Sequence, residues 1–465
     1  MRPQLKGKTI LVLGLGDTGW SMTRWLRQHG ARVRVADSRP NPPHAGQLRA
    51  ETPEVELRAG AFDAQTFSGV DAIAISPGVD RREPLVAEAI ARGVPVVGDV
   101  ELFAQAVEEN TPAGASAPAV IAITGSNGKS TVTAMAGDMC KSAGRRTIVA
   151  GNIGLPVLDA WSGVEESKSV PDLFVLELSS FQLESTASLK PMAAAMLNVS
   201  EDHMDRYRDL ADYAAAKSRI FTGDGVQVLN RDDPWSMGMQ RPGRACVTFG
   251  LDAAPSSSDW GLVTVNGRRN LAQGDRALIA TEELPVAGLH NAANALAALA
   301  LTHAVGIEEA PALDALRHFK GLPHRVEDVA TIRGITFYDD SKGTNVGATV
   351  AALRGMARRT ILIAGGDGKG QDFRPLAPAV KASAKAVVLI GRDAPAIRSV
   401  LAHCGIPLLG THSMEEAVRL AYGVAVAGDA VLLSPACASY DMFRNYIHRA
   451  EAYVAAVRIL EQSEG

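Results

Sequence analysis

The sequence predicts a doubly wound α/β protein with about three domains. Short runs made almost entirely of apolar residues alternate with longer alanine-rich stretches, which is typical of parallel strands covered by helices on both faces. The chain has 465 residues. This is too long for one ordinary core and fits domains of about 150 residues each. The clearest strand predictions are residues 9–13, 119–123, 173–176, 360–363 and 386–390.

Composition and charge exclude several classes of protein. Hydrophobic residues make up 46% of the chain and charged residues 21%, so neither a disordered chain nor a membrane span is predicted. The formal charge is -4, and no long basic block could follow a nucleic-acid backbone. The N-terminus leads into a strand rather than an export signal, and the four cysteines show no CxxC spacing. We therefore expect a cytoplasmic protein with reduced thiols and no nucleic-acid partner.

Two breaks in the pattern divide the chain. Residues 111–118, with the sequence TPAGASAP, are mostly small or proline and are typical of a linker. A second break lies near residues 321–323, between a helical stretch that ends around Phe319 and a strand-like run at 334–338. We therefore expect domains at residues 1–112, 113–321 and 322–465.

One segment departs from the alternation of strands and helices. Between residue 227 and about residue 284, turn residues separate short stretches in which apolar and polar residues alternate. This alternation is typical of antiparallel strands. We expect a small antiparallel sheet in addition to the parallel sheet of the middle domain.

A first glycine loop, GLGDTG at residues 14–19, follows the first predicted strand and precedes a helical run, and Asp37 ends the next strand. This is the context of the dinucleotide fingerprint, in which glycines let the backbone approach a pyrophosphate and the acid reaches a ribose hydroxyl. Taken alone, the loop would fit NAD or a tight turn without a ligand. It indicates a diphosphate joined to a sugar. Its residues are Gly14, Leu15, Gly16, Asp17, Thr18 and Gly19.

A second glycine loop, TGSNGKST at residues 124–131, lies between another apolar strand and a helix. In such a loop backbone N–H groups cradle phosphates, Lys129 neutralises the outer phosphates, and the hydroxyl of Ser130 or Thr131 can ligate Mg²⁺. Ile123 stands where the usual motif has its first glycine, yet a GKST tetrad at such a turn is seldom accidental. We predict an ATP site formed by Gly125, Ser126, Asn127, Gly128, Lys129, Ser130 and Thr131.

The two loops together favour a ligase. A dehydrogenase needs no second phosphate loop with its own lysine, whereas an ATP-dependent enzyme that acts on a nucleotide-linked substrate needs both. Polar residues follow later strands. Glu177 ends a strand where Mg²⁺ could bind, with a solvated acid as the alternative. On the residues alone, His203 could be structural or a ligand, and Lys217 would be an exposed helix cation.

In chain order, motifs spread over nearly the whole sequence resemble the Mur ligases, which build the peptide stem of bacterial peptidoglycan. ELSSFQL and SPACAS are most similar to the family member that adds D-glutamate. The P-loop and the HR pair would fit any Mur ligase or the similar folylpolyglutamate synthases. The motifs are GLGDTG (14–19), SPG (76–78), GSNGKST (125–131), GNIG (151–154), ELSSFQLE (177–184), NVSEDHMD (198–205), GLPHR (321–325), DSKGTN (340–345), GGDGK (365–369) and SPACAS (434–439).

The resemblance implies a Rossmann-like N-terminal domain that binds UDP rather than NAD, a central P-loop domain that binds ATP, and a Rossmann-like C-terminal domain for the amino acid. The small-molecule substrates would be UDP-N-acetylmuramoyl-L-alanine and D-glutamate. The D-glutamate site would use Thr344, Lys369, Ser439 and Tyr446, the last being tyrosine where the family pattern has phenylalanine. Residues expected at the UDP-linked substrate are Gly14, Leu15, Gly16, Asp17, Thr18, Gly19, Asp37, Ser38, Gly78, Asn152 and Ser179, with His203 at its carboxylate.

The resemblance also implies the catalytic residues Lys129, His203, Lys217 and Lys342. Ser130 and Glu177 would ligate one Mg²⁺, and His203 and Lys217 a second, with Lys217 carbamylated because CO₂ turns its amine into an anionic oxygen ligand. The interval from His203 to Lys217 is about one residue shorter than the family pattern, so Lys217 is the first assignment to question. Asn291 and Asn294, one helical turn apart, would approach adenine together with Arg325 and Asp340.

The implied reaction forms an acyl phosphate and then a tetrahedral intermediate. We expect a monomer whose domains close about hinges near residues 112 and 321. Three alternatives remain at this point: an NAD-dependent oxidoreductase, a non-catalytic nucleotide sensor, and another amino-acid ligase of the same superfamily.

Overall fold

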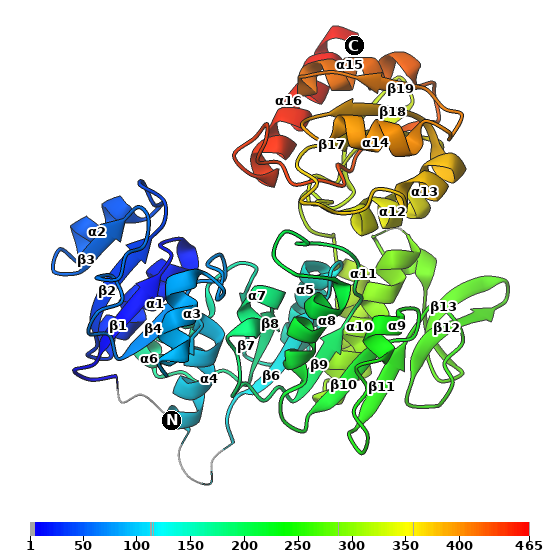
Figure 1. Cartoon of the computed structure of the whole chain (residues 1–465). Helices are drawn as coiled ribbons and strands as arrows, with labels where there is room; N and C mark the ends of the chain where they lie inside the picture. The colour runs from blue at the N-terminus through cyan, green and yellow to red at the C-terminus, as the bar shows by residue number, and fades with distance from the viewer. Residues whose placement is uncertain (1–4, 112–113, 115, 287, 357, 465) are drawn as a thin grey trace.

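A computed structural model describes residues 5–111, 114, 116–286, 288–356 and 358–464, which form three successive α/β units (Figure 1). The predicted α/β class is confirmed, because parallel strands alternate with covering helices in each unit. The predicted boundary at residues 112 and 113 falls outside the described residues. The boundary at 321 lies between α11 (Glu309–His318) and β15 (Glu327–Ile332).

The N-terminal unit is a parallel sheet in the order β3-β2-β1-β4-β5. The strand order reverses beside β1, so the loops after β1 and β4 diverge and leave a crevice at the carboxyl ends of these strands. The first glycine loop and residues 76–78 lie there. The elements are β1 (Thr9–Leu13), α1 (Asp17–Gln28), β2 (Arg32–Asp37), α2 (Ala45–Glu51), β3 (Glu56–Ala59), β4 (Ala72–Ile75), α3 (Pro84–Ala91), β5 (Val96–Val97) and α4 (Asp99–Asn110).

The middle unit has a larger sheet in the order β14-β13-β12-β11-β10-β9-β6-β8-β7. Its parallel part carries the second glycine loop between β6 and α5. The elements are β6 (Ala119–Thr124), α5 (Lys129–Ser142), β7 (Thr147–Gly151), α6 (Val157–Ser167), β8 (Leu173–Glu177), α7 (Ser180–Glu184), β9 (Ala193–Met196), α8 (Leu210–Ser218), η1 (Arg219–Phe221), β10 (Val226–Asn230), α9 (Pro234–Met237), β11 (Cys246–Phe249), β12 (Trp260–Val265), β13 (Arg268–Gln273), β14 (Arg276–Ala280), η2 (Thr281–Glu283), α10 (Leu289–Ala304) and α11.

The predicted antiparallel segment is confirmed only over its second half. Strands β12, β13 and β14 pair antiparallel, but β10 pairs in parallel with β11 on one side and with β9 on the other. The reason is the helix α9, which returns the chain across the sheet so that β11 runs in the same direction as β10. The antiparallel strands extend the main sheet through the pairing of Phe249 with Trp260.

The C-terminal unit has a sheet in the order β15-β16-β20-β17-β18-β19, in which β15 is antiparallel to β16 and the other pairs are parallel. Apolar clusters cover both faces of this sheet. The remaining elements are β16 (Ile335–Asp339), α12 (Val346–Gly355), β17 (Thr360–Gly365), α13 (Leu376–Ser383), β18 (Ala384–Ile390), α14 (Ala394–Leu401), β19 (Leu408–Gly410), α15 (Met414–Val424), β20 (Ala430–Leu433) and α16 (Tyr446–Glu464).

Helix α4 attaches the N-terminal unit to the middle unit. Phe103 on α4 is fully buried, and its ring lies 4.9 Å from that of Phe174 on β8 and 5.9 Å from that of Trp161 on α6. The buried carboxylate of Glu101 accepts hydrogen bonds from the backbone N–H groups of Ala187 and Ser188. The two units therefore share one apolar core. On the other side, Figure 1 shows the C-terminal unit standing over the middle unit, with α12 next to α10.

The four cysteines are free. Within the described part of the chain, no helix is both long and apolar enough to cross a membrane.

Replacement of Phe103 by alanine should weaken the shared core. We expect Phe103→Ala to lower the free energy of unfolding by about 3–5 kcal/mol, because it removes a ring packed between two others. Urea unfolding followed by circular dichroism measures the change. Phe62→Ala, which removes a half-buried ring within the N-terminal unit alone, is the control. Equal losses for both variants would contradict a special role for the α4 contact.

Candidate active site

The first glycine loop is shaped by close backbone contacts. Gly14 has a φ of +87°, and a Cβ on Gly19 would lie 1.8 Å from the carbonyl oxygen of Gly14. Helix α1 can therefore start against the loop only with glycine at this position. The backbone N–H of Leu15 donates to Asp37 Oδ2 at 2.7 Å, which ties the loop to the end of β2.

Arg39 completes this first site and was not predicted. Its guanidinium bonds both carboxylate oxygens of Asp37, at 2.8 Å and 2.6 Å. Burial raises the pKa of Asp37, but the bonds from Arg39 and Leu15 outweigh it and leave the pKa below its usual value. The carboxylate is thus held in its charged form. Arg39 stands two residues after the predicted acid, and a basic side chain so close to a diphosphate loop was the signal for it.

A cavity of about 480 Å³ opens beside this loop. It brings together most of the residues predicted for the UDP-linked substrate, whereas Leu15 is fully buried and Gly19 packs beneath the loop. We call it the loop-1 cavity. Its predicted lining residues are Gly14, Gly16, Asp17, Thr18, Asp37, Ser38, Gly78 and Asn152, and the others are Arg39, Ser76, Pro77 and Val79.

The second glycine loop is held by polar residues that follow β9. The N–H of Asn127 donates to Asn198 Oδ1 at 2.9 Å, and Asn198 Nδ2 donates back to the Asn127 carbonyl at 3.0 Å. Gly128 has a φ of +84° at the start of α5. The loop therefore has a fixed backbone, as an anion cradle requires.

Two lysines converge on the same loop carbonyl. Lys129 Nζ donates to the carbonyl oxygen of Gly125 at 2.8 Å, and Lys217 Nζ donates to the same oxygen at 2.9 Å. Burial lowers the pKa of Lys129. Burial, and then the charge of Lys129, lower the pKa of Lys217 well below its usual value. Lys217 is 1% exposed, so the interpretation of an exposed helix cation is wrong.

A cavity of about 180 Å³ lies between the middle and C-terminal units, beside the loop that the sequence predicts to bind ATP, and we call it the nucleotide cavity. Arg325 reaches across it, and its Nη2 donates to Ser130 Oγ at 2.8 Å. Asp340 accepts a 2.6 Å hydrogen bond from Ser434 Oγ, and burial raises the pKa of Asp340 to about 7. The predicted residues that line this cavity are Asn127, Gly128, Thr131, Asn291, Asn294, Arg325, Asp340 and Lys342.

A third cavity of about 340 Å³ lies between the other two, and we call it the central cavity. It shares Asn152 with the loop-1 cavity and Lys342 with the nucleotide cavity. The predicted residues that line it are Lys129, Asn152, Ser179, His203, Lys217, Lys342, Thr344, Lys369, Ser439 and Tyr446. Residues from all three sequence-predicted domains therefore meet along one row of cavities.

Glu177 has the features expected of a cation ligand. It is 2% exposed and lies at the carboxyl end of β8, paired in register with Ile123 of β6, directly before the phosphate loop. Its Oε1 accepts a 2.8 Å hydrogen bond from Asn152 Nδ2, whereas its buried Oε2 has no hydrogen-bond partner. A buried carboxylate oxygen without a partner is unfavourable unless a cation binds it. The donor set therefore fits Mg²⁺ at this position.

His203 has an unusual backbone conformation, with a φ of +58°. Its ring meets the edge of Phe181, with centroids 4.7 Å apart. Burial lowers the pKa of His203 to about 4, so the imidazole is neutral near pH 7 and has a free electron pair for a metal or a proton. A strained backbone at a non-glycine residue is typical of a functional position.

Asp202 belongs to the site although it was not predicted. It forms a short ion pair with Lys369 of the C-terminal unit, and it accepts a 3.3 Å hydrogen bond from Asn345. Burial raises the pKa of Asp202, but the Lys369 charge outweighs it, and the pKa lies below its usual value. Its place after a strand end, beside His203, was the available signal.

The central cavity is rich in lysine side chains. Lys129, Lys217, Lys342 and Lys369 line it, and among its described lining residues Asp202 is the only carboxylate. Burial, and then the charge of Arg325, lower the pKa of Lys342 to about 8. Anionic ligands stabilise such an arrangement, because negative charge raises the pKa values that burial lowers in Lys129, Lys217 and Lys342. The cavity is therefore suited to phosphates and carboxylates.

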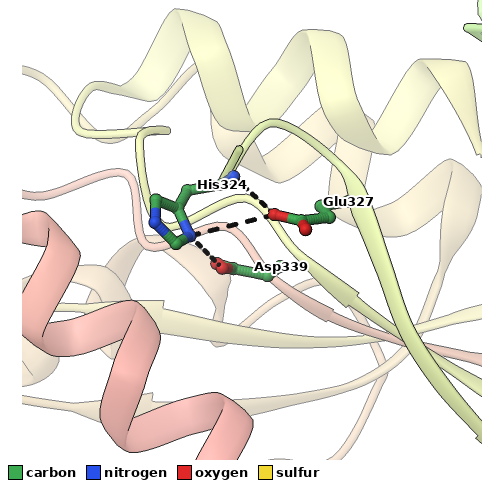
Figure 2. A group of neighbouring side chains, drawn as sticks. All are labelled: His324, Glu327 and Asp339. Atoms are coloured by element: carbon green, nitrogen blue, oxygen red, sulfur yellow. Dashed lines mark hydrogen bonds and ion pairs between the residues drawn. The ribbon is translucent and has the colours of Figure 1, made fainter. Parts of the chain in front are cut away.

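A separate group of possible metal ligands lies at the turn between the middle and C-terminal units. Within the described residues, His324, Glu327 and Asp339 are the one group of three such side chains whose ligand atoms lie within 4.8 Å of one another. Figure 2 shows the His324 ring pointing at Asp339, and His324 Nδ1 lies 2.7 Å from Asp339 Oδ2. The N–H of His324 donates to Glu327 at 2.8 Å. These mutual bonds brace the turn that carries Arg325.

Three family models match successive parts of the chain, and all three describe Mur ligase domains. Residues 8–98 match the Mur ligase MurD-like N-terminal domain, residues 123–302 the Mur ligase middle domain, and residues 324–437 the Mur ligase glutamate ligase domain. The UDP-N-acetylmuramoylalanine–D-glutamate ligase of Thiobacillus denitrificans is 58% identical, and the alignment covers 98% of this chain and 97% of that protein. The ligase of the same name from Methylobacillus flagellatus is also 58% identical, with 99% of each chain covered.

Solved structures with the same fold are more distant in sequence. The UDP-N-acetylmuramate-alanine ligase MurC of Thermotoga maritima superposes with a TM-score of 0.61 at 19% identity, covering 97% of this chain and 100% of that chain. MurF of Acinetobacter baumannii superposes with a TM-score of 0.61 at 16% identity, covering 98% and 91%. At these identities the two structures support the fold alone.

Asp340 should make stability depend on pH. Its carboxyl has a raised pKa of about 7 in the folded chain, against 3.8 ordinarily. Ionisation therefore favours the unfolded chain, and the protein loses stability as pH rises from about 4 to about 7. Asp340→Asn cannot ionise, so its Tm should exceed that of the parent by at least about 2 °C at pH 8 and match it near pH 4. Calorimetry measures this, with the exposed Asp328→Asn as control. A Tm difference independent of pH would contradict the prediction.

Proposed function

This chain belongs to the Mur ligase family, and from that premise we propose that it joins D-glutamate to UDP-N-acetylmuramoyl-L-alanine in an ATP-dependent reaction that forms an amide bond. The observation that carries the proposal is the row of three linked cavities. Asn152 joins the loop-1 cavity to the central cavity, and Lys342 joins the central cavity to the nucleotide cavity. A UDP-linked acid, ATP and an amino acid can thus meet at one point.

The UDP-linked substrate would lie across two cavities. Its diphosphate would rest on the first glycine loop and Gly78, where backbone amides and the start of α1 favour an anion. Ser38 and the paired Asp37 and Arg39 would face the uracil end. Its carboxylate would enter the central cavity past Asn152, to be positioned by Ser179 and His203.

ATP would lie with its phosphates on the second glycine loop. Asn291 and Asn294, with Arg325 and Asp340, would surround the adenosine in the nucleotide cavity. Lys129 and Lys342 would then face the γ-phosphate from two sides, since both line the central cavity. The phosphates would raise the pKa values that burial lowers in these lysines and would thus favour their charged forms.

The chemistry follows from the weak electrophilicity of a carboxylate. An oxygen of the substrate carboxylate attacks the γ-phosphorus, the bond to the bridging oxygen breaks, and ADP leaves. The amine of D-glutamate attacks the carbonyl carbon of the acyl phosphate, its nitrogen gives up one proton, and the tetrahedral intermediate collapses as inorganic phosphate leaves and takes up that proton. Lys129 and Lys342 offset the charge that develops on the phosphoryl and acyl oxygens.

Mg²⁺ would supply charge neutralisation of the transferring phosphates. The unpartnered Oε2 of Glu177 and the Ser130 hydroxyl would hold one ion. His203 and a carbamylated Lys217 would hold a second. Lys217 suits carbamylation because its buried amine has a pKa well below the usual value, and a neutral amine is the form that reacts with CO₂.

D-Glutamate would bind at the C-terminal side of the central cavity. Thr344, Ser439 and Tyr446 line that side, and Lys342 Nζ lies 3.9 Å from the centre of the Tyr446 ring. Lys369 would exchange its ion pair with Asp202 for a substrate carboxylate. Since one chain supplies all three cavities, we infer that it acts as a monomer. Free thiols and nucleotide substrates favour the cytoplasm as its location.

Phosphate release tests the proposed reaction directly. We expect release only when ATP, Mg²⁺, UDP-N-acetylmuramoyl-L-alanine and D-glutamate are all present, with one amide formed per phosphate. L-Glutamate, L-lysine and folate in place of D-glutamate separate other ligases of the superfamily, and nicotinamide absorbance separates an oxidoreductase. Lys129→Ala should lower kcat at least about 100-fold. ATP binding without phosphate release under the full set would overturn the proposal in favour of a sensor.

The carbamate has its own test. Lys217→Ala should lower activity at least about 100-fold, because it removes a metal ligand, and acetate or formate should restore part of it by supplying an anionic oxygen. Exposed Lys190→Ala should retain full activity. Activity of the parent chain should also fall when CO₂ and bicarbonate are excluded. Full activity without CO₂, together with no rescue of Lys217→Ala, would contradict the carbamate.

A further inference from the structure

Arg206 connects the N-terminal unit to the middle unit at the substrate sites. Its side chain is 9% exposed. Nη1 donates to the carbonyl oxygen of Pro77 at 3.2 Å, and Nη2 donates to that of Val79 at 3.3 Å. These two carbonyls flank Gly78 in the loop-1 cavity. One guanidinium thus holds both ends of a loop that borders the first ligand site.

The same guanidinium is fixed from the other side by α7. Nη2 donates to Glu184 Oε2 at 2.7 Å, and the guanidinium carbon lies 4.4 Å from the centre of the Phe181 ring. Glu184 Oε1 accepts a 2.6 Å hydrogen bond from Tyr207. Phe181 in turn lines the central cavity and packs against His203. Arg206 therefore touches supports of both cavities.

We propose that Arg206 is a positioning residue that sets the distance between the loop-1 cavity and the central cavity for a substrate that spans both. This inference rests on the proposed function, which places the diphosphate in one cavity and the reacting carboxylate in the other. Arg206 is not among the residues that line the cavities formed by the described part of the chain. It acts through the 77–79 loop and through Phe181.

Arginine suits this position for geometric reasons. Its planar guanidinium donates in several fixed directions and stacks on an aromatic face, whereas a lysine ammonium on a flexible stem reproduces neither property. The contact also satisfies two backbone carbonyls at the contact between units. Because a displacement of about 1 Å between reacting groups can lower a rate about 100-fold, a brace between the two ends of one substrate has direct kinetic consequences.

Arg206→Lys and Arg206→Met, measured with the full chain, test the proposal. We expect kcat/KM for UDP-N-acetylmuramoyl-L-alanine to fall about 100-fold, while KM for ATP and for D-glutamate changes less than about threefold. Binding of UDP alone, measured by calorimetry, should weaken about tenfold, because the 77–79 loop is no longer held. Arg208→Lys and Arg208→Met are matched controls two residues along the chain, where the side chain is 78% exposed, and should behave as the parent.

Glu184→Gln provides a second measurement. It weakens the ion pair but keeps the size of the side chain, so we expect a smaller loss in the same parameter. Glu184→Gln combined with Arg206→Met should be no worse than Arg206→Met alone, because both changes remove one interaction. Additive losses would contradict a shared role.

The outcomes separate this inference from the proposed function. A parent chain that binds UDP but releases no phosphate would contradict the proposed reaction. The effect of Arg206→Met on UDP binding would still test the positioning role of Arg206. If the parent is active and the Arg206 variants keep its UDP affinity and its kcat/KM, the proposed positioning role of Arg206 is wrong. KM values that rise equally for all three substrates, together with a lower Tm, would show that Arg206 only stabilises the fold. This result would also contradict the positioning role.

Discussion

The crowding of four lysines beside the second glycine loop is the constraint on which the rest of the site depends. Lys129 and Lys217 share the carbonyl of Gly125, and Lys342 and Lys369 line the same cavity. Burial and nearby positive charges disfavour the charged forms of Lys129, Lys217 and Lys342, and the pKa of Lys342 falls to about 8. Placing these four lysines together lowers the stability of the fold when no anion is bound. The arrangement is explained when a triphosphate and two carboxylic acids are the ligands, because each brings negative charge to a cavity in which Asp202 is the one carboxylate among the described lining residues.

The fold makes this crowding possible by directing strand ends. Glu177 and the second glycine loop follow adjacent parallel strands, so their polar groups emerge at one edge of the sheet. Asn198, after β9, fixes the loop from the other flank through Asn127. The C-terminal unit then adds Lys369 and Arg325 from above, each bonded to a side chain of the middle unit. The sheets thus act as rigid supports, and the loops between units carry the chemistry.

The sequence predicted the parallel strands and both glycine loops, because apolar runs and glycine spacing are local signals. It missed the parallel pairing of β10 with β11, since strand direction depends on where α9 returns the chain and not on local alternation. Lys217 shows the same limit, because its burial depends on where α8 packs. Asp202 and Arg206 were missed because their partners, Lys369 for the first and residues 77–79 with Glu184 for the second, are distant in sequence. Arg39 was missed although its partner Asp37 is only two residues away. The joint placement of Asn291 with Asp340 was inferred from the family resemblance alone.

The turn before β15 gives a physical basis for the expected movement near residue 321. His324 and Val326 both have positive φ values, +62° and +52°. For a β-branched residue such as Val326 this backbone conformation costs about 1–3 kcal/mol of conformational free energy. It is retained only where surrounding interactions hold the backbone in place. Here Asp339 and Glu327 hold His324 (Figure 2), while Arg325 between the two strained residues reaches Ser130. The same turn stores strain and carries Arg325 to Ser130 at the start of α5, so the contact between the middle and C-terminal units includes one of the bonds that keep the turn in its strained form.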